Sequence, residues 1–167
     1  MYKLKEMVMY GNEGICEISE FMKRSFQEKT IEYYVLKPVY NQTSTIYVPI
    51  NNKELTKKMK KVLSLDEIMQ LIHSISGAES VWIDNDNLRK EKYKEILMNG
   101  NRRELMKLIR TLYLHQEKLK EEGKKFHAVD DKFYKDAEKL LYEEFAYVLN
   151  IEQDEVVPFI CQQIQGE

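Results

Sequence analysis

The residues that most often catalyse reactions or bind metals are scattered along this chain. Its three histidines, His73, His115 and His127, stand apart, with no second histidine or cysteine at ligand spacing. Cys16 lies between apolar residues that would not stabilise a thiolate. The sequence contains no phosphate-binding glycine motif and no G-x-S-x-G nucleophile motif. These observations predict a protein that is not an enzyme, needs no cofactor or metal, and works by binding.

One candidate binding group lies in the first third of the chain. The segment KRSFQEK, residues 23–29, is expected to join two strands, and its alternation places Arg24 and Phe26 on the same exposed side. Tyr47, on a later strand, shares that face if the strands pair nearby. An arginine beside aromatic rings is a frequent composition of protein-interface hot spots. The alternative, with Phe26 packed inward and Arg24 merely solvated, fits the composition equally well.

A second candidate group surrounds Trp82, the single tryptophan. It precedes two basic stretches of helical sequence, which contain Arg89, Lys90, Lys92, Lys94, Arg102 and Arg103. Basic helices beside an exposed aromatic ring suit a nucleic-acid backbone, because the ring can stack on a base or wedge at a base step. In the alternative, Trp82 belongs to a hydrophobic core together with Val81 and Ile83.

The distribution of charge is uneven. The chain has a net charge of −2, but residues 53–125 carry 17 basic and 12 acidic side chains, and residues 126–167 carry 3 and 10. A basic middle and an acidic end are compatible with a nucleic-acid-binding face backed by a solubilising one. They are also compatible with a helical bundle whose charged faces are simply solvated.

Two periodicities predict the elements that position these groups. Up to about residue 50 the pattern repeats every two residues, in ICEISEF, IEYYVLKPVY and TSTIYVPI, with a turn at 41–44. This alternation puts Phe21 on the side of Ile15. It predicts five short strands in a small bent sheet or open barrel.

After Pro49 the period becomes helical. Helices are predicted over 64–77, 86–100, 101–122, from after 130 to about 148, and 153–163. Ser64 is the expected first N-cap and Gly77 the first stop. The sequence thus predicts an α+β protein with a β module at 1–52 and an all-α bundle of about five helices at 53–167.

No run of 18 apolar residues and no signal-peptide pattern is present, so a cytoplasmic location is expected. The oligomeric state is open, with a monomer favoured.

The order of several motifs resembles the CarD/CdnL family of bacterial RNA-polymerase-binding transcription regulators. The matching stretches are VMYGNEGICEI, EYYVLK, IYVPI, RKEKYKEILMNGN, LMKLIRTLYLHQ and KDAEKLLYEEFA, which follow one another with plausible spacing. The resemblance implies a Tudor-like domain at 1–52 that docks on the RNA polymerase β subunit. It also implies a helical domain at 53–167 that faces promoter DNA and stabilises the open complex.

Carried over by position, the family's polymerase contacts fall on Arg24, Phe26 and Tyr47, the last where many relatives have arginine. Relatives place a tryptophan wedge just before a basic segment. Here Arg89 stands near that position and Trp82 lies seven residues earlier. Either residue is therefore a candidate for the wedge. The main alternative function is a non-enzymatic adaptor that joins RNA polymerase to another protein without touching DNA.

Overall fold

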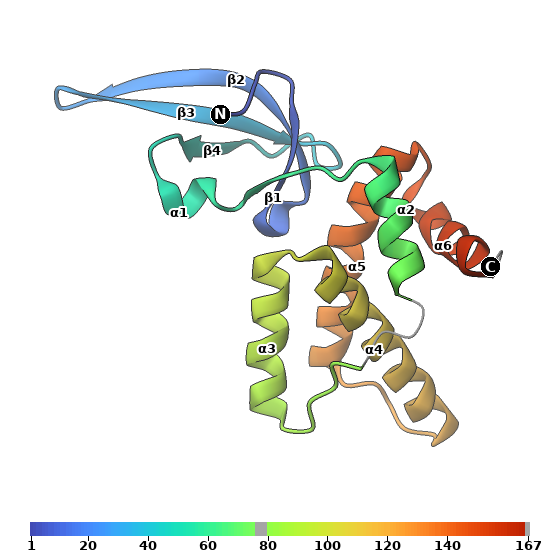
Figure 1. Cartoon of the computed structure of the whole chain (residues 1–167). Helices are drawn as coiled ribbons and strands as arrows, with labels where there is room; N and C mark the ends of the chain where they lie inside the picture. The colour runs from blue at the N-terminus through green and yellow to red at the C-terminus, as the bar shows by residue number, and fades with distance from the viewer. Residues whose placement is uncertain (76–79, 166–167) are drawn as a thin grey trace. The chain divides into compact units, whose positions relative to one another are not determined.

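The computed structural model describes residues 1–75 and 80–165 (Figure 1), and the chain divides into two compact units, Met1–Val62 and Leu63–Glu167. The division comes after Val62. The boundary predicted from the change between strand-like and helix-like sequence patterns was at residue 52. The reason is that helix α1 (Lys53–Thr56) is followed by one more strand, β5 (Met59–Lys61), which joins the sheet of the first unit. Gly77, the predicted helix stop, lies outside the described residues.

The first unit is built on a five-stranded antiparallel sheet, which confirms the predicted β module. The strands are β1 (Met7–Tyr10), β2 (Ile15–Phe26), β3 (Lys29–Pro38), β4 (Ile46–Pro49) and β5, and their order across the sheet is β4-β3-β2-β1-β5. The core on one face is apolar, and its buried members are Val8, Tyr10, Cys16, Ile18, Tyr34, Leu36, Val48 and Met59.

Strands β2 and β3 are longer than expected and run past β4 as an extended hairpin (Figure 1). Only Gln27 and Glu28 form the turn, with φ of 44° and 67°. Two-residue hairpin turns with positive φ at both positions match the right-handed twist of the flanking strands. Residues 23–26 therefore belong to β2, and the prediction that residues 23–29 form a connection was wrong for most of that segment.

A β-bulge at Ser19 changes which side chains face the core. Ile18 pairs with Leu36, and the next pair is Glu20 with Val35, so one residue of β2 is left over. Beyond the bulge the alternation is reversed. Phe21 pairs with Tyr34, and their rings lie 5.7 Å apart. Phe21 is thus on the side of Ile18, and its predicted place beside Ile15 was wrong.

The second unit is helical, as predicted. Its helices are α2 (Leu65–Ser74), α3 (Asp86–Asn99), α4 (Arg102–Glu121), α5 (Ala128–Leu149) and α6 (Val156–Gln165), with a 3-10 turn η2 (Gln153–Glu155) before α6. Ser64 caps α2 in a capping box with Glu67, and Gly100 ends α3 in the left-handed conformation. Among the described residues, no helix combines the length and apolarity that a bilayer span requires.

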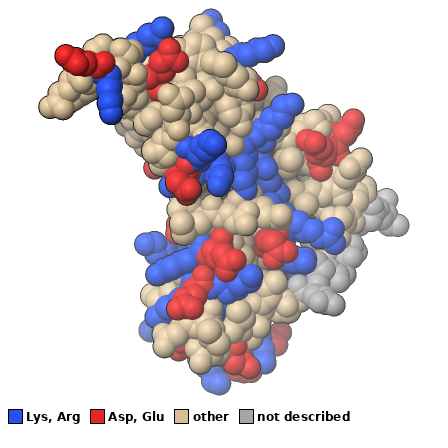
Figure 2. Space-filling view, turned by 60° about the vertical axis from the view of Figure 1, so that its left-hand side comes forward, with Lys and Arg blue, Asp and Glu red and all other residues tan. Residues whose placement is uncertain are grey.

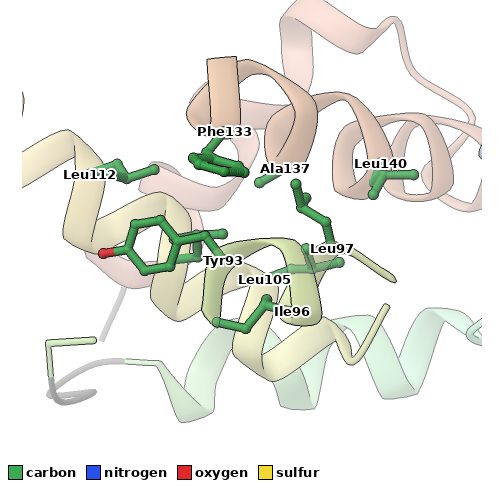
Figure 3. Close-up of a cluster of buried hydrophobic side chains, with 9 residues drawn as sticks. Tyr93, Ile96, Leu97, Leu105, Leu112, Phe133, Ala137 and Leu140 are labelled. Atoms are coloured by element: carbon green, nitrogen blue, oxygen red, sulfur yellow. The ribbon is translucent and has the colours of Figure 1, made fainter. Parts of the chain in front are cut away.

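Two apolar clusters hold the helices together. One joins α3, α4 and α5 through Tyr93, Ile96, Leu97, Leu105, Leu108, Leu112, Phe133, Ala137 and Leu140 (Figure 3). The other packs α2 and α6 against α4 and the C-terminal half of α5 through Ile68, Ile72, Met106, Leu141, Phe145 and Val156. The first cluster is the one that fixes the segment carrying Trp82.

Candidate functional site

The sheet brings the first candidate group together on the face opposite the core. Arg24 pairs with Ile31 across β2 and β3, and Tyr47 pairs with Val35 across β3 and β4. Paired residues share a face, and so do residues two positions apart on one strand. The Arg24 guanidinium carbon lies 5.3 Å from the centre of the Tyr47 ring, within cation–π range.

Apolar side chains on this face are left in solvent. Phe26 is 69% exposed, Tyr47 45% and Ile31 36%. We call Arg24, Phe26, Ile31 and Tyr47 the docking face. Exposed aromatic and aliphatic groups around an arginine offer a partner apolar area and a charged, multiply donating anchor. Sequence reasoning missed Ile31, although its position in the alternation of TIEYYV would have placed it there once the hairpin turn was known.

A shallow hollow lies beside the docking face in the same unit. Thr30, Ile31 and Pro49 line it together with residues 51–54, at the point where β4 leads into α1. Ile31 is shared between the hollow and the docking face. A partner side chain could therefore contact both at once.

In the helical unit, Trp82 is held between two other side chains. Its ring is stacked on His115, with centroids 3.7 Å apart and 22° between the planes, and the Arg89 guanidinium carbon lies 4.5 Å from its centre. Its indole Nε1 donates to Asp84 Oδ1 at 2.9 Å. Burial lowers the pKa of His115 and thereby favours the neutral form of the stacked imidazole. Trp82 is half-buried against the α3–α4–α5 cluster, between the two alternatives that the sequence left open.

Arg89 is an internal residue. Only 6% exposed, it donates from Nε to Asp130 Oδ1 at 3.0 Å and from Nη2 to Asp130 Oδ2 at 3.3 Å. It also pairs with Asp86 at 3.0 Å and donates to the carbonyl of Ile83 at 3.0 Å. The burial and these bonds speak against the predicted DNA contact at Arg89, because its donors are already directed at groups of this chain.

Arg102 has a similar environment at the start of α4. It donates to both carboxylate oxygens of Glu144, at 3.0 and 2.7 Å. Glu144 also accepts a bond from the backbone N–H of Leu63 at 3.0 Å. The guanidinium thus links α4 to α5 and to the residue that begins the helical unit, which leaves it poorly placed for the DNA role predicted from sequence.

The other predicted DNA-binding residues lie on the surface. Lys94 and Arg103 are exposed, Lys90 is half-buried, and Lys92 is exposed with its ammonium 3.9 Å from Glu95. On the visible face of the helical unit, basic and acidic side chains are interspersed (Figure 2). Four of the seven predicted residues, Lys90, Lys92, Lys94 and Arg103, therefore remain available to a polyanion at the surface.

The division into units shows which unit carries the basic surplus of residues 53–125. Residues 1–62 carry 11 Lys/Arg and 7 Asp/Glu, a net charge of +4, and residues 63–167 carry 15 and 21, a net charge of −6; together they give −2. Five lysines between residues 53 and 61, against a single acid, supply most of the surplus that the sequence placed in the helical part. The basic unit is the β unit.

Comparison with known families agrees with this division. Residues 2–63 match the family described as CarD-like/TRCF RID domain. The N-terminal unit is thus similar to the CarD-like/TRCF RID domains. The match ends within one residue of the boundary after Val62, and it bears out the resemblance for this part of the chain. No curated protein matches the chain. In the described residues, no three His, Cys, Asp or Glu side chains are grouped so as to hold a metal ion.

Proposed function

We propose that this protein is a transcription regulator that binds the RNA polymerase β subunit through the docking face and contacts promoter DNA through its helical unit. In doing so it stabilises the open complex relative to the closed one. The observation that carries the proposal is the exposed docking face on a domain of the CarD-like family. The proposed DNA contact depends on Trp82 and the surface lysines and arginine of the helical unit.

The docking face is suited to a tight contact because part of it is already ordered. Arg24 lies over the Tyr47 ring in the free protein, so little side-chain entropy is lost when a partner covers the pair. Phe26, on the same strand, supplies the largest exposed apolar area. An arginine flanked by aromatic rings is the composition expected of an interface hot spot, where a single truncation costs about 2 kcal/mol or more.

The helical unit is proposed to reach DNA through Trp82 and the surface residues Lys90, Lys92, Lys94 and Arg103. Arg89 and His115 then act as positioning residues, because they hold the two faces of the Trp82 ring. The net charge of −6 predicts weak binding of this unit to free DNA. Tethering to polymerase raises the effective concentration and compensates for that weakness.

The effect on transcription would be thermodynamic. A protein that touches both polymerase and the upstream edge of melted DNA binds the open complex more tightly than the closed complex. It can shift the equilibrium only by the ratio of those two affinities. A difference of about 1.4 kcal/mol corresponds to a tenfold shift.

The test of the polymerase contact uses two neighbouring charge reversals. Arg24→Glu is expected to abolish co-elution with the isolated β-subunit lobe and with whole polymerase. Lys23→Glu makes the same change of charge one residue away on the other face of β2, where Lys23 pairs with Glu32 at 3.3 Å, and should co-elute normally. If both variants bind alike, the docking face is not the polymerase site.

The test of the DNA contact measures the lifetime of open complexes formed with polymerase and a promoter. Lys92→Glu/Lys94→Glu on α3 is expected to shorten that lifetime while polymerase binding persists. Lys132→Glu/Lys139→Glu on α5 reverses the same number of exposed lysines and serves as the matched control.

The net charge of −6 on the helical unit favours a second candidate, an adaptor that joins polymerase to another protein. Under that function, the α3 variant would leave open-complex lifetime unchanged. The Arg24→Glu variant would still lose polymerase. The two experiments together therefore separate the candidates.

A further inference from the structure

The N-terminal unit carries a concentration of lysines that the docking face does not use. Lys53 begins α1, Lys57 and Lys58 follow its end, and Lys60 and Lys61 lie on β5. All but Lys60 are exposed, and Glu54 is the single acid in residues 53–61. Strand β5 is the edge of the sheet opposite β4, so Lys60 and Lys61 lie at the far side of the sheet from the strand that carries Tyr47, whereas Lys53 lies beside the hollow where β4 leads into α1.

The start of the chain adds two more lysines to the same region. The Tyr2 hydroxyl donates to the carbonyl of Met59 on β5 at 3.0 Å, which fixes the N-terminal segment beside that strand. Lys3, Lys5 and Lys61 consequently line one shallow hollow. The one carboxylate of the hollow, Glu6, accepts a bond from the backbone N–H of Lys3 at 2.7 Å. The hollow is therefore dominated by ammonium groups.

We propose that these lysines, which we call the lysine edge (Lys3, Lys5, Lys53, Lys57, Lys58, Lys60 and Lys61), bind the phosphate backbone of duplex DNA. This goes beyond the proposed function, which places DNA contact in the helical unit. The lysine edge would supply a second, sequence-independent contact from the polymerase-binding unit itself.

The chemistry of the surface favours duplex backbone over other nucleic-acid targets. Lysine ammonium groups act as point charges on phosphates and read no base edges. Residues 53–61 contain no aromatic side chain on which the bases of a single strand could stack. Helix α1, the β1–β5 ladder and the Tyr2 bond hold the backbone in place, so binding orders only side chains.

The edge strand offers a simpler reason for lysines, since charge on an edge prevents pairing with another chain. That reason accounts for Lys60 and Lys61 on β5 but not for Lys53, Lys57 and Lys58 before it, nor for Lys3 and Lys5. Neutralising one phosphate contributes about eightfold to affinity at 0.1 M salt relative to 1 M, because log K falls by about 0.9 per decade of salt for each contact. Seven lysines are thus enough for binding that can be measured at low salt.

The test measures anisotropy of a fluorescent random-sequence duplex titrated with the full-length protein at several salt concentrations. Lys57→Glu/Lys58→Glu is expected to weaken binding at least tenfold at 0.1 M salt and to lower the slope of log K against log salt by about 2. Lys124→Glu/Lys125→Glu in the helical unit makes the same net change of charge at exposed positions and should have little effect. The neutral variant Lys57→Gln/Lys58→Gln should show an intermediate loss of affinity. It keeps the test valid if the charge-reversed variant misfolds.

The proposal is overturned if both double reversals weaken binding equally, since net charge alone would then explain the loss. It is also overturned if the Lys57/Lys58 variants bind DNA as the wild type does. If they lose the polymerase lobe instead of DNA, the lysine edge serves a protein partner. The proposed polymerase contact is tested separately. Arg24→Glu leaves the lysine edge unchanged, and its effect is measured by co-elution with polymerase.

Discussion

The buried ion pair between Arg89 and Asp130 yields the strongest prediction about the helical unit. Asp130→Asn keeps the shape of the side chain but removes its charge and turns one acceptor into an amide donor that faces the guanidinium. Arg89 and Asp130 are only 6% and 1% exposed, so the remaining charge cannot be hydrated. Removing one partner of a buried pair costs about 3–5 kcal/mol.

The environment of Arg89 places the expected loss at the lower end of that range. Arg89 keeps its contact with Asp86 at 3.0 Å and its bond to the Ile83 carbonyl at 3.0 Å. We therefore expect Asp130→Asn to lower the free energy of unfolding by about 3 kcal/mol. With an m-value of about 2 kcal/mol/M, the urea midpoint falls by about 1.5 M.

The neighbouring residue Asp131 provides the control. Both acids stand in the first turn of α5, so both substitutions lose the same favourable interaction with the helix dipole. Asp131 pairs with Lys135 at 2.9 Å in a partly exposed i,i+4 arrangement, which is worth about 0.3–0.5 kcal/mol. Asp131→Asn should thus shift the midpoint by a small fraction of the shift at Asp130.

The assay follows the intrinsic fluorescence of Trp82, which lies in the helical unit and reports on it separately from the β unit. Equal midpoints for the two variants would refute the reasoning, because they would show that burial adds nothing to the cost of an unpaired Arg89. A further variant, Arg89→Met/Asp130→Leu, replaces both charges and should recover most of the lost stability.

Three shorter predictions test other parts of the structure. Ser64→Ala removes the α2 capping box and should cost about 1 kcal/mol in the same urea experiment, whereas a change below 0.3 kcal/mol would mean that the cap is unimportant. Phe26→Ser should alter stability by less than about 0.5 kcal/mol but weaken binding of the polymerase lobe by at least about 1 kcal/mol in a titration. Burial raises the pKa of Tyr93 to about 12, above the ordinary value of about 10 in the unfolded chain. Stability contributed by the neutral phenol is therefore full below pH 10 and lost between pH 10 and 12, and Tyr93→Phe should flatten that part of the stability–pH curve.

Local physical chemistry explains why much of the helical unit was predictable from the sequence. Helix starts and ends depend on caps that are near neighbours in the chain, such as Ser64 with Glu67, and Gly100 at the end of α3. The core positions of α5 follow the helical repeat of about 3.6 residues, which the sequence shows. Phe133, Ala137, Leu140, Leu141 and Phe145 lie at that spacing and are buried.

What the sequence determined by itself was the α+β class, the helices, and a set of charged and aromatic residues without catalytic spacing. Only the tertiary structure decided which of those residues reach solvent. The bulge at Ser19 reversed the faces of β2, and pairing across three strands put Arg24 over Tyr47. Arg89 is buried because it pairs with Asp130, which lies 41 positions away in the chain. The physical reason is that the environment of a side chain depends on strand register and on long-range partners, which short-range propensities do not encode.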